Sequence, residues 1–323
     1  MPDRDTVDRD SADRDLADCR RLLANGSRTF LAASWLLPRA VREPACALYA
    51  YCRQADDEVD GVADPASAVA GLRQRLAALY AGRPAERLAD RALAAVAQRH
   101  GIPPALPEAL IEGFAWDAEG RRYETLDDVQ AYAARVAGTV GAMMALLMGT
   151  RDPAALARAC DLGVAMQLSN IARDVGEDAA MGRLYLPRQW LREAGIDPDA
   201  WLADPVHSPA LAGVVQRLLD AADALYERVG AGVAELPLAC RPGINAARFL
   251  YAEIGHEVAR RGLDPLAGRA VVSGAPGGAV HRARAARARR IRRPAALSAG
   301  PAAPSFRPGA ASGRAAWPAP AGA

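Results

Sequence analysis

The sequence contains no lysine, so every permanently cationic side chain is an arginine. Its 40 basic residues nearly balance its 38 acidic residues, and the formal net charge of +2 predicts no polyanionic partner such as nucleic acid. With 51% apolar and 24% charged residues, the composition is typical of a folded protein. A chain of 323 residues can form one large domain followed by a tail.

Cysteine and histidine motifs are also missing. The chain has five cysteines, an odd number, and no two of them have CxxC spacing. Its four histidines show neither HExxH nor another paired ligand spacing, which argues against a zinc site. We therefore expect buried, reduced thiols and a cytoplasmic protein.

Neither long apolar runs nor alternating strand patterns are present. The richest apolar run, residues 136–149, is shorter than the roughly 20 residues that span a bilayer. The charged N-terminal segment has no apolar core of the kind that a signal peptide requires. Segments rich in Ala, Leu and Arg instead carry apolar residues at helical spacing, which predicts an all-α protein.

Capping residues mark several helix starts. Pro44 indicates a start near residue 43, and the pair Asp152 and Pro153 supplies an N-cap followed by a first-turn proline. The segment 125–128, Thr-Leu-Asp-Asp, resembles a capping box. The expected helices cover residues 12–25, 28–37, 43–61, 65–81, 84–100, 104–121, 126–149, 153–178, 208–235 and 242–262, with loops at 102–107 and 179–209.

The helical pattern stops at about residue 273. We expect a polar extension over residues 1–19, one folded domain over 20–273, and a tail over 274–323. The tail is rich in Arg, Ala and Pro and nearly lacks large aliphatic and acidic residues, so we expect it to be disordered.

Acidic residues gather at the C-terminal end of one expected helix. At 100° per residue, Arg53, Asp56 and Asp60 share a face, and Asp57 lies beside it. Several carboxylates at this end repel one another and oppose the helix dipole. The pattern is either a solvated acidic helix end or a site for hard divalent cations such as Mg²⁺, which prefer oxygen ligands.

A second polar stripe crosses a mostly apolar helix. Gln167, Asn170, Asp174 and Asp178 fall within an arc of roughly 80°. An internal ion-pair network with Arg173 is one explanation, but buried carboxylates are costly unless they are paired or metal-bound. Metal ions between two such helices would hold a diphosphate leaving group beside an apolar cavity, which predicts prenyl transfer.

At these motifs the sequence resembles the squalene/phytoene synthase family, over roughly residues 20–273. The string ARDVGEDAAMGRLYLP at 172–187 is similar to the phytoene-forming bacterial members. The resemblance also includes SRTF at 27–30, ALYAYCRQADDEVD at 47–60, YETLDD at 123–128, VAGTVGAM at 136–143 and ARRGLDPLAGRAVVS at 259–273.

The resemblance implies a single-domain helical bundle of the isoprenoid synthase type, with two aspartate-rich motifs facing a central cavity. The family ligands of Mg²⁺, or of Mn²⁺ in its place, match Asp56, Asp57, Asp60, Asn170, Asp174 and Asp178. Positions near the diphosphates match Ser27, Arg53, Arg173, Arg183 and Tyr185. Cavity positions that steady a cationic intermediate match Tyr132, Gln167 and Tyr251, so the implied catalytic set is these three together with Arg53 and Arg173.

The reaction that the resemblance implies is head-to-head condensation of two geranylgeranyl diphosphates to phytoene, the first committed step of carotenoid biosynthesis. Prephytoene diphosphate is the intermediate, diphosphate is released, and no hydride from NADPH is needed. Because substrate and product are apolar, we also expect peripheral contact with the inner face of the membrane.

Other functions remain open at this point. The enzymatic alternative is squalene or dehydrosqualene formation from farnesyl diphosphate, because sequence alone does not give the depth of the cavity. The non-enzymatic alternative is a catalytically silent lipid-binding or assembly protein of the same fold. Such a protein should have lost some of the acidic ligands, whereas this sequence retains both acidic motifs. RNA binding would rest on the arginine tail alone, and the core carries no recognition motif for it.

Two departures from the family pattern stand out. Thr29 replaces a common serine, which conserves the hydroxyl. Relatives usually continue after residue 273 with another apolar helix, whereas this chain continues with the arginine-rich tail. A reading-frame shift near Gly274 and a basic membrane-binding arm over residues 282–293 are the two hypotheses for that change.

Overall fold

The computed structural model describes residues 15, 17–23, 28–230 and 232–271. Within these ranges the chain forms helices and no strands, which confirms the all-α prediction. The predicted tail, most of the polar N-terminal extension and Ser27 lie outside the described residues.

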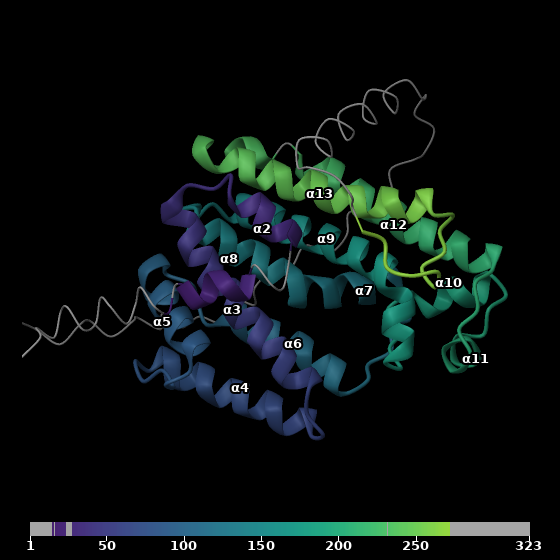
Figure 1. Cartoon of the computed structure of the whole chain (residues 1–323), viewed down its shortest axis with the longest axis horizontal. Coiled ribbons are helices and arrows are strands. Elements are labelled where there is room, and N and C mark those ends of the chain that lie inside the picture. The colour runs from purple at the N-terminus through teal and green to yellow at the C-terminus, as the bar shows by residue number, and fades with distance from the viewer. Residues whose placement is uncertain (1–14, 16, 24–27, 231, 272–323) are drawn as a thin grey trace, which may run out of the picture.

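The helices follow one another in a bundle (Figure 1). The bundle begins with a helix at residues 15–23, of which residue 16 is not described. The first half of the bundle comprises α2 (Arg28–Ser34), α3 (Arg39–Asp60), α4 (Pro65–Tyr80), α5 (Leu88–His100), α6 (Ala105–Ala118) and α7 (Leu126–Ala133). The second half comprises α8 (Thr139–Leu147), α9 (Pro153–Ala180), α10 (Arg188–Glu193), α11 (Pro198–Ala203), α12 (Pro209–Val229) and α13 (Arg241–Arg260).

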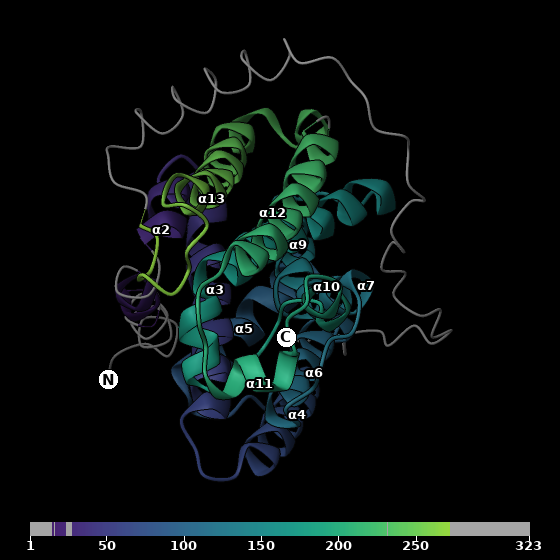
Figure 2. The ribbon, with the colours of Figure 1, turned by 90° about the vertical axis from the view of Figure 1, so that its right-hand side faces the viewer.

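Helix α9 runs through the middle of the bundle. It packs against α8, α12 and α13, and Figures 1 and 2 show α12 and α13 on one side of it and α3 to α6 on the other. Leu168, Ile171 and Val175 of α9 are buried in a cluster with Leu211 and Leu218 of α12. Burying each such side chain stabilises the fold by about 1.5–3 kcal/mol, so these contacts hold the C-terminal half of α9 against α12.

A π-helical segment (Ala134–Gly138) joins α7 to α8. The sequence predicted one continuous helix here, and the interruption coincides with close packing against α9. A Cβ at Gly163 of α9 would lie 2.3 Å from the carbonyl oxygen of Ala137, so the two backbones touch. This contact places one wall of the central cavity against α9.

Most helix starts agree with the capping signals. Thr125 and Asp128 form the predicted capping box, and the Asp152 side chain accepts a hydrogen bond from the backbone N–H of Ala155. The start predicted from Pro44 is wrong, because α3 begins at Arg39 and carries the proline inside. The residues of the next turn are buried, and their packing offsets the loss of the one backbone hydrogen bond that a proline cannot donate.

The long loop predicted over residues 179–209 is also wrong, because it contains α10 and α11. Each has only six residues, too few for apolar periodicity to develop. The other correction is the end of α12 at Val229, which is followed by 3-10 segments at Gly232–Glu235 and Leu238–Cys240. Gly230 and Gly232 are poor helix formers and account for this break.

Candidate active site

The first acidic motif occupies the last turns of α3. Arg53 pairs with Asp57 at 2.6 Å and approaches Asp56 at 3.7 Å. Burial, and next the nearby carboxylate of Asp60, raise the pKa of Asp56 to about 6. The motif therefore holds more negative charge than its own arginine neutralises.

The second acidic motif occupies the C-terminal part of α9. Asp174 accepts a 2.6 Å hydrogen bond from Nε of Arg173. Burial, and next the carboxylate of Asp174, raise the pKa of Asp178 to about 7, while Arg183 acts in the opposite direction. No arginine among the described residues lies within ion-pair distance of Asp178, so its charge is only weakly compensated.

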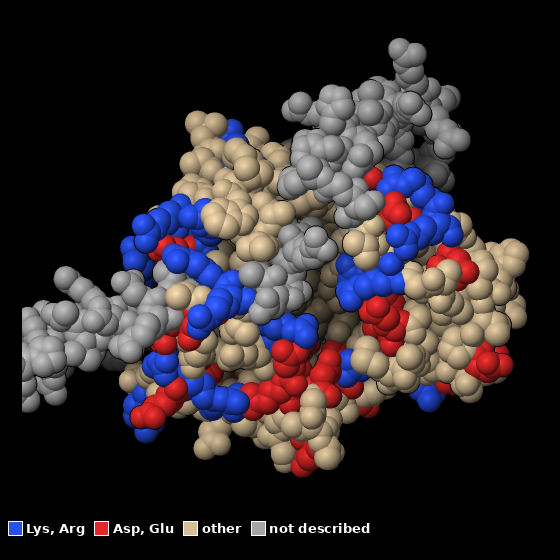
Figure 3. Space-filling view, in the orientation of Figure 1, with Lys and Arg blue, Asp and Glu red and all other residues tan. Residues whose placement is uncertain are grey.

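Arg183 connects the two motifs. It follows α9 in the chain, and its guanidinium pairs with Asp60 at the end of α3 at 2.6 Å. The ends of α3 and α9 therefore face each other, as the resemblance implied. Figure 3 shows a hollow near the middle of this face of the molecule, bordered by both acidic and basic side chains.

A cluster of tyrosines surrounds a carboxylate between the two motifs. Asp117 of α6 accepts hydrogen bonds from Tyr132 at 2.7 Å and from Tyr185 at 2.6 Å, and these two rings stack 4.9 Å apart. Tyr123 stacks on Tyr185 with ring centroids 5.7 Å apart. Burial raises the pKa of Tyr132 well above its usual value, so its hydroxyl remains protonated and can donate.

An apolar cavity of about 300 Å³ extends inward from the acidic end of α9. Asn170, Gln167 and Tyr251 line its polar end, and Ala155 lines the far end. Fifteen helical residues separate Asn170 from Ala155, or about 22 Å at about 1.5 Å per residue. The remaining wall is mostly aliphatic and aromatic, including Leu48, Tyr49, Val136, Met144, Leu162, Val233 and Ile244.

The oxygen donors at the mouth of the cavity fit a hard divalent cation. Oδ1 of Asn170 is buried without a hydrogen-bond partner, an arrangement that is costly unless a ligand completes it. Among the described residues, however, no three acidic, histidine or cysteine side chains are close enough to hold a metal ion by themselves. The donors therefore fit Mg²⁺ that is shared with substrate phosphates, which is the usual arrangement for this ion.

Two polar groups at this site were not assigned a definite role from the sequence. The sequence motifs give Asp117 no definite role, and Arg269 lies in the matched string 259–273 without one. Arg269 contacts Asp174 at 3.2 Å and Glu177 at 3.3 Å. It belongs to an irregular segment after α13, where no periodicity could have indicated its position.

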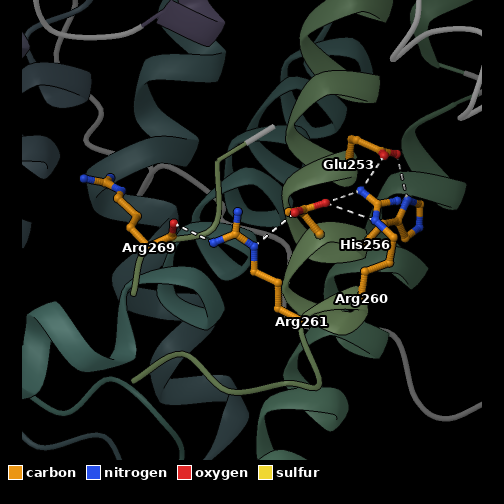
Figure 4. Close-up of polar contacts among 6 residues, drawn as sticks. Glu253, His256, Arg260, Arg261 and Arg269 are labelled. Atoms are coloured by element: carbon orange, nitrogen blue, oxygen red, sulfur yellow. Dashed lines mark hydrogen bonds and ion pairs between the residues drawn. The ribbon is translucent and has the colours of Figure 1, made fainter. Parts of the chain in front are cut away.

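Contacts from α13 anchor the segment that carries Arg269. Figure 4 shows Arg261 donating to the carbonyl oxygen of Arg269, at 3.0 Å, while its Nε contacts Glu257. On α9, a Cβ at Gly176 would lie 2.8 Å from the carbonyl oxygen of Pro265, so the segment lies against the second motif. These backbone contacts hold the segment in a position from which the Arg269 side chain reaches Asp174.

The described residues of the predicted site lie around this one hollow. The acidic ligands lie at the ends of α3 and α9, Arg53, Arg173 and Arg183 pair with them, and Tyr132 and Tyr185 form the tyrosine cluster. Gln167 and Tyr251 line the cavity, whereas Ser27 is not described. Phe30, from the matched string at 27–30, lines the cavity as well.

Comparison with known proteins agrees with this geometry. Residues 23–275 match the family model described as squalene/phytoene synthase. The chain is 60% identical over 255 residues to a phytoene synthase of Rhodobacter capsulatus, covering 78% of this chain and 75% of the relative. It is 55% identical over 262 residues to a phytoene synthase of Cereibacter sphaeroides, covering 78% and 74%.

Solved structures of squalene and dehydrosqualene synthases have a similar fold. A dehydrosqualene synthase crystal structure superposes with a TM-score of 0.77 at 28% identity, covering 87% of this chain and 99% of the other. The squalene synthase HpnC of Alicyclobacillus acidocaldarius superposes with a TM-score of 0.72 at 25% identity, covering 79% and 97%. The chain therefore belongs to the squalene/phytoene synthase family of prenyl-transferring enzymes.

Proposed function

We propose that the protein joins two molecules of geranylgeranyl diphosphate head to head and forms phytoene through prephytoene diphosphate. Its family implies a prenyl diphosphate substrate, and its similarity to curated phytoene synthases supports this product. The observation that carries the proposal is the placement of the apolar cavity. It begins at Asn170, on the same helix that presents Asp174 and Asp178 at its end.

The charged rim would bind the diphosphates. Asp56, Asp60, Asn170, Asp174 and Asp178 would hold Mg²⁺, or Mn²⁺, which would neutralise the leaving diphosphate. Asp57, the sixth predicted ligand, pairs with Arg53 in this structure and would release it on turning toward the cation.

Arginines of the rim would contact the phosphate oxygens directly. Arg53, Arg173 and Arg183 now pair with carboxylates that would turn toward a cation. A guanidinium released in this way donates several hydrogen bonds in a fixed plane, which suits phosphate oxygens. The present ion pairs therefore hold each guanidinium close to where the diphosphate would bind.

The cavity would protect the carbocation that remains after diphosphate leaves. Its mostly apolar wall would exclude water, and the ring faces of Tyr49 and Tyr251 are electron-rich surfaces that attract a cation. Gln167 and Asn170 lie at the boundary between rim and cavity, and a 3.4 Å contact joins their side chains. Deprotonation of the rearranged cation would end the reaction without a hydride donor, so no NADPH is required.

Chain length separates this proposal from its enzymatic alternative. Dehydrosqualene and squalene synthases share the fold, so the fold does not distinguish a farnesyl from a geranylgeranyl substrate. The distance of about 22 Å along α9 from Asn170 to Ala155 favours the longer, four-isoprene chain. The high identity to phytoene synthases points the same way.

Product analysis tests the proposal. The purified full chain would be incubated with Mg²⁺ and either geranylgeranyl or farnesyl diphosphate, without NADPH, and the hydrocarbons separated by chromatography. We expect phytoene from the longer substrate, and we expect none from Asp174→Asn. The exposed Asp220→Asn on α12 is the matched control and should retain activity. Product from farnesyl diphosphate alone would assign the chain to the shorter-substrate branch.

Membrane contact belongs to the same proposal. Within the part of the chain that the structure describes, every helix is too short or too polar to cross a bilayer. A water-insoluble hydrocarbon product nevertheless has to reach lipid, so we expect the protein to bind the cytoplasmic membrane surface peripherally.

A further inference from the structure

Three large apolar side chains are exposed at one corner of the molecule. Trp35 and Leu36, in the turn after α2, are 66% and 49% exposed, and Leu238, in the 3-10 segment before α13, is 76% exposed. Exposed apolar side chains occur singly on many proteins, but a group of them needs an explanation. These three residues are called the corner patch below.

Direct packing brings the two parts of the corner patch together. A Cβ at Gly243, at the beginning of α13, would lie 2.6 Å from Cδ2 of Leu37 and 3.3 Å from the carbonyl oxygen of Ala33. The turn after α2 is therefore in contact with the beginning of α13. Figures 1 and 2 both show α2 beside α13.

Arginines border the corner patch. The guanidinium of Arg42 stacks on the ring of Trp35 at 4.9 Å, and no acidic side chain among the described residues pairs with it. Arg39, one turn earlier on α3, pairs with Glu43 at 2.6 Å and has a side chain that is 78% exposed. Figure 3 shows an uncharged surface over this end of α13 with basic side chains beside it.

The corner patch lies outside one wall of the cavity. Leu236 and Ile244, on either side of the 3-10 segment that carries Leu238, both line the cavity. Ala33 packs against Ala247, and Ala247 also faces the cavity. Only this layer separates the exposed corner from the space proposed to hold the prenyl chains.

We propose that the corner patch, with Arg39 and Arg42, seats the protein on an anionic lipid bilayer. Trp35, Leu36 and Leu238 would enter the boundary between headgroups and acyl chains, where tryptophan is favoured. The two arginines would contact lipid phosphates. The inference rests on the proposed function in one respect: a bilayer beneath this wall would receive the water-insoluble product.

Vesicle binding tests the inference on the full chain. Vesicles of phosphatidylcholine with or without phosphatidylglycerol would be sedimented with wild type, with the double variant Trp35→Ser, Leu238→Ser, or with Arg42→Gln. We expect the double variant to lose affinity at least about tenfold for both vesicles. Arg42→Gln should lose about fivefold, and only with the anionic vesicles. The control is Val206→Ser, which removes an apolar side chain that is 56% exposed elsewhere.

Fluorescence quenching by brominated lipids locates the contact. We expect less quenching in Trp35→Phe than in wild type, because Trp35 would be the tryptophan that enters the bilayer. Wild-type affinity in the double variant, or equal quenching in Trp35→Phe, would overturn the inference and assign membrane binding to another surface. A dimer of wild type that dissociates in the double variant would also overturn it, in favour of a second copy of the chain.

Turnover of detergent-dispersed substrate separates this inference from the proposed function. The corner patch does not line the cavity, so the double variant should turn over dispersed substrate at the wild-type rate. If wild type itself forms no product, the proposed function fails, whatever the vesicles show. If wild type is active and the double variant still binds vesicles normally, only the assignment of this surface fails.

Discussion

At the scale of single residues, the rim of the cavity is arranged at the expense of stability. Asp56 and Asp178 have a raised pKa because burial and neighbouring carboxylates disfavour their charged forms. An acid whose pKa is higher in the folded than in the unfolded state destabilises the fold increasingly as the pH rises above the unfolded value, and fully above the folded value. Residues selected for stability alone would not be placed here, which is typical of functional sites.

Asp178→Asn separates function from stability. Because the amide cannot replace an anionic ligand, we expect product formation to fall by about a hundredfold or more. Because repulsion with Asp174 is removed, we expect the unfolding temperature at pH 8 without Mg²⁺ to stay equal or rise. Steady-state turnover and calorimetry measure the two effects. A variant with near-normal turnover would remove Asp178 from the metal site.

The acidic residues could be identified from the sequence because their spacing places the side chains of each motif on one face of a helix. Asp56, Asp60, Asp174 and Asp178 lie at the ends of two helices that do face each other. Arg269 could not be given a role in the same way, because its position depends on an irregular segment crossing α9. Asp117 lies on a mostly buried helix, and only the tertiary structure brings two tyrosine hydroxyls to it.

At the scale of elements, glycines let α9 approach the π segment and α8 closely. At Gly163 a Cβ would meet the backbone of Ala137 at 2.3 Å, and at Gly141 it would meet the carbonyl oxygen of Ala159 at 2.2 Å. Backbone atoms cannot move aside as a flexible side chain can. The cavity wall therefore depends on these positions having no side chain.

Gly163→Ala tests this packing. We expect a loss of about 1–3 kcal/mol in the free energy of unfolding, because the added methyl forces the two backbones apart. Gly213→Ala on the exposed side of α12, where nothing lies within 4 Å, is the matched control. It should be about 0.5–1 kcal/mol more stable than wild type, since alanine favours helix. Denaturant titration measures both, and equal stability of Gly163→Ala and wild type would contradict the packing.

Element prediction succeeded where capping residues marked a boundary and failed for short or interrupted helices. The box at Thr125 and the cap at Asp152 were visible in the sequence. The start of α11 carried a similar signal, Asp197 followed by Pro198, but its six residues show no periodicity. The π segment was not predictable, because no local sequence signal marks it and its packing partners α6 and α9 are distant in the chain.

At the scale of the whole molecule, one helix joins the charged rim to the far end of the cavity. Asp174 and Asp178 lie near the C-terminus of α9, and Ala155 lies in its first turn. On the proposed function, the length of α9 would set how far a prenyl chain can extend from the diphosphate site. The sequence predicted the cavity through family resemblance, but its depth required the three-dimensional positions of its lining residues.

Ala155→Leu tests whether the far end of the cavity sets chain length. A larger side chain there should block the last isoprene unit of geranylgeranyl diphosphate and leave room for farnesyl diphosphate. We expect the ratio of turnover between the two substrates to shift at least about tenfold toward farnesyl diphosphate. Ala154→Leu, on the exposed side of the same turn, is the control. An unchanged ratio would place the end of the bound chain elsewhere.

The central claim is that the ends of α3 and α9 act together on one diphosphate through shared metal ions. Its most direct test is a crystal structure of the full chain with Mg²⁺ and an unreactive thio-analogue of geranylgeranyl diphosphate. We expect Mg²⁺ bridging the diphosphate to carboxylates of both motifs, including Asp60 and Asp174, with the prenyl chain extending toward Ala155. Metal bound by one motif alone, or a prenyl chain outside the cavity, would contradict the claim.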